Sequence, residues 1–303
     1  MKKRTLPTWF AIALLLFSLA PIQASRAQKD TGNGIFWEIS GKGLTRPSYL
    51  FGTYHLLSGA YLNKLPNVKA AFEGADGVVV ESEIDSSKLM QMLPMLVMQD
   101  KKLSDLVSKE DYDILASEVQ QSTGTPIELM AQLKPIFITL MLTVTYAKAG
   151  RLSELEESDG SSLDSHIAKV ARQKKQGVSA FESMEEQMHL LFDHHPVEEQ
   201  ARQLVEFVKL KDEMVTAQDE LLGLYLREDL DGLYTLYQKY EKQFGESSWL
   251  LDDRNENWIK QLPAILEEGS QFIAVGALHL AGNKGLVELL RKQGYTVTAR
   301  EVK

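Results

Sequence analysis

Two histidines of this 303-residue chain follow apolar segments in the same way. The segments SYLFGTYHL and QFIAVGALHL both continue from an apolar run into Gly-x-x-His-Leu. Gly52 and Gly276 mark the expected strand ends, because glycine lets the backbone turn tightly or approach another group closely. Ligand sites of α/β sheets lie beyond the carboxyl ends of the strands. His55 and His279 are therefore expected at a shared site.

Carboxylates occupy comparable positions. Glu81 ends the apolar segment GVVVE, Glu83 follows it with the period of two that a strand gives to one face, and Glu182 follows VSAF. Two histidines and one carboxylate are a frequent ligand set for a divalent metal. The same groups equally suit a metal-free site in which a histidine or a glutamate acts as general base.

The remaining candidate residues do not follow predicted strand ends. Arg254 lies in the polar stretch LDDRN at the start of a predicted helix, and spacing alone favours a solvated charge cluster that caps this helix. Four other histidines do not follow strand ends, and we interpret them as surface or packing residues: His166, His189, His194 and His195.

Short strands near both ends of the chain must position these groups. Apolar or alternating segments predict strands at 36–39, 48–51, 77–81, 177–181, 272–275 and 295–302, with the first two forming a hairpin. Helical spacing at 65–74, 161–175 and 284–293 connects several of them. Strand–helix–strand order favours parallel pairing. The sequence therefore predicts an α/β fold with a mixed, mainly parallel sheet built from both ends of the chain and a large helical insertion.

The first residues have the order of a secretory signal peptide. A basic start at 2–4 precedes an uncharged apolar stretch at 9–20, and a small-x-small pattern ends at Ala27. We expect cleavage after Ala27, with Ala24 as the second choice and an uncleaved anchor as the alternative. The predicted organisation is a signal peptide at 1–27 and a single domain at 28–303, in which 86–268 form a mostly helical lobe. The expected location is periplasmic or secreted.

The composition of the chain excludes some classes of binding partner and of metal ligand. The formal net charge of −9 argues against nucleic acid, because phosphate binding needs clustered lysine and arginine. No apolar run after the signal peptide approaches the ~20 residues of a membrane span, so no stable span is expected after cleavage. The chain has no cysteine, so a metal site would use His, Asp, Glu, Asn or carbonyl ligands. The oligomeric state is left open.

The ordered motifs resemble the TraB/GumN family, the bacterial relatives of the animal Tiki proteins. The resemblance includes the two Gly-x-x-His motifs and the strand-end glutamate of VVVES. It also includes Leu163-Asp164, the segment FESMEEQ at 181–187, and Arg254-Asn255. It runs in order from about residue 36 to residue 302.

The resemblance implies a fold related to the erythromycin-esterase-like and haem-binding ChaN-like proteins, with both histidines and the glutamate in one cleft. It implies a metal-dependent peptidase or other hydrolase that uses manganese or cobalt, with His55, Glu81 and His279 as metal ligands. In this interpretation Arg254 stabilises an oxyanion, and Glu182 orients a ligand or acts as a further base. The expected partner is a peptide or small-molecule substrate. The alternative is a non-catalytic periplasmic protein that binds or sequesters a peptide, a signal or a haem-like ligand.

Overall fold

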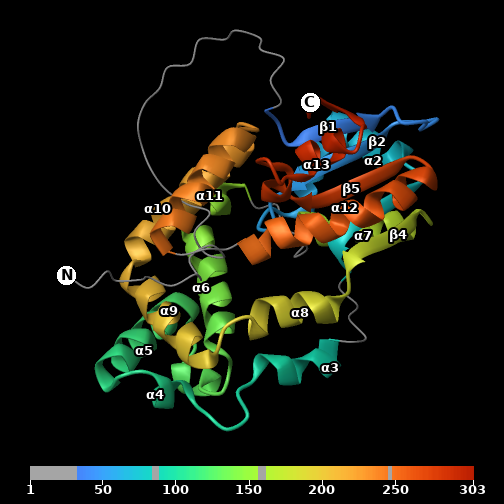
Figure 1. Ribbon diagram of the computed structural model, residues 1–303. Coiled ribbons are helices and arrows are strands. Elements are labelled where there is room, and N and C mark those ends of the chain that lie inside the picture. Colours follow the sequence, from blue (N-terminus) through green and yellow to red (C-terminus); the bar gives the residue numbers. More distant parts are fainter. Residues whose placement is uncertain (1–32, 84–88, 156–161, 245–247) are drawn as a thin grey trace.

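The computed structural model describes residues 33–83, 89–155, 162–244 and 248–303 (Figure 1). The predicted signal peptide and its cleavage site lie outside these ranges. Among the described residues, no helix combines the length and apolar character needed to cross a membrane.

The described residues form one sheet whose strand order is β4-β3-β5-β2-β1-β6. Its strands are β1 (Phe36–Ser40), β2 (Ser48–Thr53), β3 (Gly77–Ser82), β4 (Gly177–Glu182), β5 (Gln271–Gly276) and β6 (Thr296–Ala299). The pairs β2–β5, β3–β5 and β3–β4 are parallel, whereas β1 is antiparallel to both β2 and β6. The predicted α/β class, the β1–β2 hairpin, and the sharing of one sheet by the strands that end near Phe51 and Val275 are confirmed.

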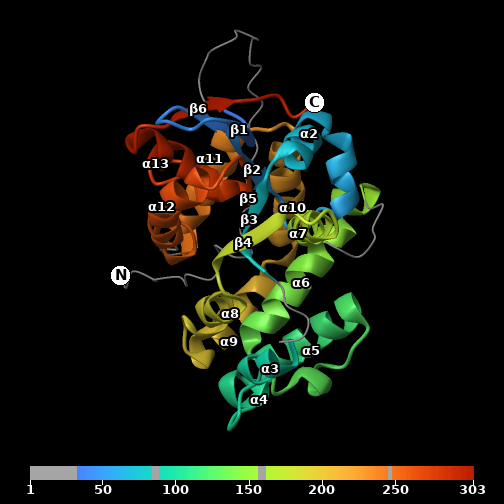
Figure 2. The ribbon, with the colours of Figure 1, turned by 90° about the vertical axis from the view of Figure 1, so that its right-hand side faces the viewer.

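Helices cover both faces of this sheet (Figure 2). One face packs on η1 (Gly59–Lys64), α2 (Pro66–Gly74) and α7 (Leu163–Gln173), and the other on α12 (Asp252–Glu267) and α13 (Leu286–Lys292). Neighbouring residues of β5 alternate between the two cores, with Phe272 and Ala274 on the first side and Ile273 and Val275 on the second. This alternation follows from the period of two in a strand, and burial on both sides explains its continuous apolar sequence.

The other helices form a lobe that extends below the sheet, with α10 and α11 rising beside it (Figures 1 and 2). The lobe contains α3 (Leu89–Met92), η2 (Leu93–Leu96), α4 (Leu103–Leu106), α5 (Lys109–Thr123), η3 (Ile127–Met130), α6 (Pro135–Ala149), η4 (Arg151–Glu154), α8 (Met184–Asp193), α9 (Val197–Lys209), α10 (Lys211–Leu226), α11 (Leu230–Phe244) and η5 (Ser248–Leu250). Within 86–268 the chain returns to the sheet through α7 and β4, and again through α12, so this range is not one uninterrupted excursion.

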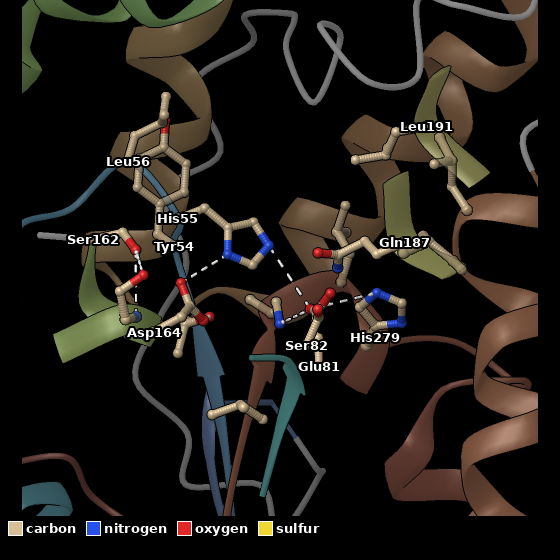
Figure 3. A pocket seen from close by; sticks show the side chains of 18 of the residues that line it. Tyr54, His55, Leu56, Glu81, Ser82, Ser162, Asp164, Gln187, Leu191 and His279 are labelled. Atoms are coloured by element: carbon tan, nitrogen blue, oxygen red, sulfur yellow. Dashed lines mark hydrogen bonds and ion pairs between the residues drawn. The ribbon is translucent and has the colours of Figure 1, made fainter. Parts of the chain in front are cut away.

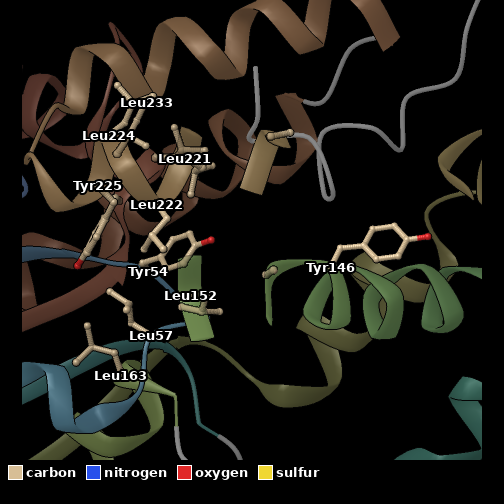
Figure 4. Packing of buried hydrophobic residues seen from close by; sticks show 14 of the residues in the cluster. Tyr54, Leu57, Tyr146, Leu152, Leu163, Leu221, Leu222, Leu224, Tyr225 and Leu233 are labelled. Carbon is tan, nitrogen blue, oxygen red and sulfur yellow. The ribbon is translucent and has the colours of Figure 1, made fainter. Parts of the chain in front are cut away.

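The lobe and the sheet share one hydrophobic cluster (Figure 4). Leu222 and Tyr225 of α10 belong to the same cluster as Tyr54 and Leu57, which follow β2. The Tyr225 hydroxyl donates a hydrogen bond of 2.9 Å to the carbonyl of Gly52. Helix α10 therefore holds the end of β2, where the first histidine motif begins.

Local capping starts the two helices that border the site. The Ser162 hydroxyl accepts from the Ser165 N–H at the start of α7. At the start of α8, Ser183 and Glu186 form a capping box. These caps fix where α7 and α8 begin, directly beside Asp164 and Glu182.

Candidate functional site

The two histidine motifs meet because β2 and β5 are parallel neighbours. Thr53 is in register with Gly276, so both strands end at the same edge of the sheet. His55 lies just beyond β2, and His279 lies in the short 3-10 helix η6 (Ala277–Leu280) that follows β5. The sequence predicts this convergence of strand ends.

Both motif glycines permit close approach. A Cβ atom at position 52 would lie 2.8 Å from the Cα of Ala277, in the backbone of the other motif. A Cβ atom at position 276 would lie 3.0 Å from His55 Nε2 and 3.2 Å from Glu81 Oε1. Gly52 therefore lets the two motifs touch, and Gly276 leaves a space between the candidate reactive groups.

His55 is held by a carboxylate. Its Nδ1 lies 2.8 Å from Oδ2 of Asp164 in the first turn of α7, and the Thr53 hydroxyl donates a hydrogen bond to the other oxygen. The His55 side chain is 58% exposed, and its Nε2 faces Glu81 at 3.8 Å from Oε1 (Figure 3). The charge of Asp164 raises the pKa of His55 to about 9, although partial loss of hydration within the cleft opposes this.

His279 is held by an amide instead. Asn255 Nδ2 donates to the carbonyls of His279 and Lys284, so its Oδ1 accepts from His279 Nδ1–H at 2.8 Å. This bond assigns the tautomer and leaves a lone pair on His279 Nε2. The side chain is 4% exposed, and burial lowers the pKa of His279 to about 3.

Glu81 lies between the two rings. Its Oε1 accepts from the Gly276 N–H at 2.6 Å and lies 3.7 Å from His279 Nε2, while Oε2 accepts from Arg254 Nη2 at 2.8 Å. Burial alone would raise the pKa of Glu81. The neighbouring imidazole and guanidinium groups and the Gly276 N–H outweigh it, and they hold the pKa well below its usual range. Glu81 is therefore a buried, ionised carboxylate.

Arg254 is the centre of a buried network rather than part of a solvated cap, which corrects the interpretation from spacing alone. Its Nε and Nη2 donate to Glu182, Nη2 also to Glu81, and Nη1 to His279 Nε2 at 3.1 Å and to the carbonyl of Leu250. These bonds engage all five N–H donors of the guanidinium. Helix α12 is amphipathic, and packing against the sheet turns the Arg254 side inward.

Glu182 completes this network from β4. Besides Arg254, its Oε1 accepts from the Trp258 indole N–H at 2.8 Å. The ring of Trp258 packs 4.3 Å from the ring of His279, measured between centroids, and stacks on Phe181. Glu182 therefore supports Arg254 and contacts neither histidine through a hydrogen bond in the described structure.

All five predicted site residues lie in one connected network: His55, Glu81, Glu182, Arg254 and His279. Sequence reasoning did not place Asp164, Asn255 and Trp258 in the site, although Asp164 and Asn255 stand in quoted family motifs. Their spacing in the sequence does not indicate these roles, because only the tertiary fold brings each residue to its partner.

The donor set fits a divalent cation in kind. His55 Nε2, His279 Nε2 and Glu81 Oε1 face one space, and each histidine has its Nδ1 bound to an acceptor, as metal-binding imidazoles do. Two ligand atoms at ~2.1 Å from a tetrahedral metal are about 3.4 Å apart, slightly closer than the 3.7 and 3.8 Å here. No three His, Asp or Glu side chains of the described residues form a ready-made metal cluster. To bind a metal, the three ligand atoms would have to move slightly closer together, and Arg254 would have to release its hydrogen bond to His279 Nε2.

The network opens into a cleft between the sheet edge and the helical lobe. Its volume is about 510 Å³, within the usual range of ligand sites. The side chains of Tyr54, Gln187 and Leu191 line it beside the two histidines (Figure 3). The reactive groups therefore face a space large enough for part of a substrate.

Comparison with known proteins agrees with the motifs. The sequence model of the TraB/PrgY/gumN family matches residues 35–299. A curated relative from Xenopus tropicalis, named Metalloprotease TIKI2, is 22% identical over 356 aligned positions that cover 90% of this chain. The chain spans about 60% of the length of that relative. No solved structure matches the chain significantly.

Proposed function

This chain belongs to the TraB/PrgY/gumN family, and we propose that it is a metal-dependent hydrolase that cleaves peptide bonds. One observation carries the proposal: two equivalent Gly-x-x-His motifs direct the Nε2 atoms of His55 and His279 toward one ionised carboxylate, Glu81. A relative named as a metalloprotease supports the same reaction class.

In this proposal His55, Glu81 and His279 hold the metal, for which manganese or cobalt is our choice. A bound divalent metal supplies Lewis acidity and a more acidic water. The anchored Nδ1 atoms of both histidines orient the rings and fix which nitrogen is free.

The chain's own groups have further roles. His55 is the exposed member, so in a metal-free site its deprotonated Nε2 could accept a proton from water or substrate. Arg254 can donate to a developing oxyanion only after it releases one of its present acceptors. The bond to His279 Nε2 is one to a neutral group, so it is weaker than the bonds to carboxylates. Glu182 keeps Arg254 oriented.

The decisive experiment measures turnover against metal content. The purified protein is incubated with a peptide library after chelation, and after reloading with manganese or cobalt. We expect cleavage that is lost on chelation and restored by one of these ions. The control is His189→Ala, which removes an exposed histidine of α8 that does not line the cleft.

Two other outcomes have definite meanings. Cleavage that survives complete metal removal would contradict the metal-dependent mechanism and favour general-base catalysis by His55. Tight peptide binding without any cleavage would favour the non-catalytic sequestering protein, for which the size of the cleft is the supporting observation.

We place the reaction in the periplasm or outside the cell. The order of basic, apolar and small residues in 1–27 supports export. Mass spectrometry of the protein recovered from its native compartment should find an N-terminus at Gln28 or Ser25, and an intact Met1 would contradict cleavage.

A further inference from the structure

We infer that the wall of the cleft opposite the sheet is a subsite for an uncharged, apolar side chain within a peptide, and that it disfavours a free terminal carboxylate. This inference rests on the proposed function, since it names which part of a peptide the cleft accepts.

The wall is apolar and comes from several helices of the lobe. It is lined by Leu140, Val144, Leu191, Leu221 and Leu233. These residues come from α6, α8, α10 and α11, so four helices converge on the space in front of the histidines. A recessed apolar surface beside a few convergent polar groups is the usual composition of a ligand site.

Val144 shows that this surface is open. Its exposed fraction is 38%, whereas Leu142 on the same helix is fully buried. Helix α6 is apolar along most of its length, and Val144 lines the cleft. Burying such surface under a ligand yields about 25 cal/mol per Å². An apolar side chain of the substrate would obtain this gain, and a charged one would not.

The charged residues that line the cleft disfavour a free C-terminal carboxylate of a peptide. The described lining contains two arginines, and both are already paired: Arg172 with Glu83, and Arg254 with Glu81 and Glu182. Asp164 and Glu81 add negative charge near the histidines. Against the wall formed by α6, α8, α10 and α11, a free carboxylate would find no unpaired arginine or lysine among these lining residues and would lose its hydration. His55, which is cationic when protonated, and the proposed metal lie at the sheet edge, and His55 already contacts Asp164. The cleft therefore fits a chain interior better than a carboxyl terminus.

The test compares matched fluorogenic peptides that differ at one central position, leucine or aspartate. A third peptide carries the leucine as its free C-terminal residue. We expect kcat/KM for the internal leucine peptide to exceed both others by about 10–200-fold, the range over which apolar pockets discriminate.

Val144→Asp should reduce the leucine preference at least tenfold. Leu129→Asp is the matched control, because Leu129 is 77% exposed on the lobe and lies outside the cleft. Val144→Thr keeps the side-chain shape and covers the case in which the aspartate variant unfolds, as judged by thermal melting. An unchanged preference in folded Val144→Asp, or in Val144→Thr if the former unfolds, would overturn the inference.

Binding separates this inference from the proposed function. Fluorescence anisotropy of the same peptides with His55→Ala protein measures selection without turnover. Leucine selectivity in binding without cleavage by the wild type supports the subsite and contradicts the hydrolase. Cleavage or binding that is equal for leucine and aspartate peptides overturns the subsite and leaves the hydrolase intact.

Discussion

The two Gly-x-x-His motifs have the same spacing and end adjacent strands, yet their histidines have opposite protonation tendencies. His55 is 58% exposed and contacts a carboxylate, which raises its pKa to about 9. His279 is 4% exposed and contacts the neutral amide of Asn255, and burial lowers its pKa to about 3. The carboxylate partner of His55 and the burial of His279 therefore determine the protonation of each ring more than the shared motif does.

This difference has a functional consequence. A histidine that stays neutral at all physiological pH values is a permanent lone-pair donor, which suits His279 as a fixed ligand. A histidine that takes up a proton near its partner carboxylate suits proton transfer or pH-dependent ligation, which places that role on His55. The equivalent ends of β2 and β5 thus supply two histidines with different roles, a fixed ligand and a group that can take up a proton.

Replacement of either histidine gives the largest expected effect. His55→Ala and His279→Ala should each lower kcat/KM for peptide cleavage by about 10²–10⁴-fold, because each removes a group at the reacting centre. Stability should separate them. His279→Ala leaves Asn255 Oδ1 without its buried donor and an Arg254 N–H without its acceptor, and should cost about 1–3 kcal/mol. Replacing the exposed His55 should cost about 1 kcal/mol or less.

Steady-state kinetics and urea unfolding of both variants check this prediction, with His189→Ala as the control. Full activity in the folded fraction of either variant would show that the histidine is structural.

The sequence predicts the positions of the two histidines, because these positions follow from where the strands end. Apolar segments followed by Gly-x-x-His indicate where β2 and β5 stop, and parallel pairing brings His55 and His279 to one edge. Glu81 follows from the same argument on β3. These predictions succeed because each depends on a local pattern and on one rule of sheet topology.

The sequence does not predict what surrounds each ring. Asp164 reaches His55 across 109 residues, and only the docking of α7 against the sheet brings them together. Arg254 stands in a polar stretch, and its burial depends on how α12 packs. Partners set by tertiary packing leave no periodic signal, so the protonation difference became visible only in the structure.

Replacement of Asp164, the carboxylate that contacts the first motif, should make the pKa values of the two histidines more similar. In metal-free wild-type protein, His55 should lose its proton as the pH rises through about 9, and His279 should remain neutral down to about 3. Asp164→Asn removes the main cause of the raised pKa, so the pKa of His55 should fall by about 2 units toward its ordinary value near 6.5.

NMR titration of the imidazole signals after chelation measures both values. The His279 signal serves as the internal control, because it contacts Asn255 and not Asp164. A His55 midpoint that stays near 9 in the variant would assign the shift to Glu81 instead of Asp164.

The two motif glycines provide the smallest and most selective test. Gly52→Ala places a methyl group 2.8 Å from the Ala277 backbone, which cannot move without shifting η6, so unfolding stability should fall by about 1–3 kcal/mol. Gly276→Ala places its methyl group against two side-chain atoms, His55 Nε2 at 3.0 Å and Glu81 Oε1 at 3.2 Å. Because a side chain can give way by a few tenths of an ångström, stability should change less, but the space between the candidate ligands is filled. We therefore expect Gly276→Ala to lose manganese or cobalt binding in calorimetry while it melts close to the wild type, and Gly52→Ala to show the reverse balance. Equal losses of stability in both variants would mean that the second glycine is required for folding rather than for the open space at the site.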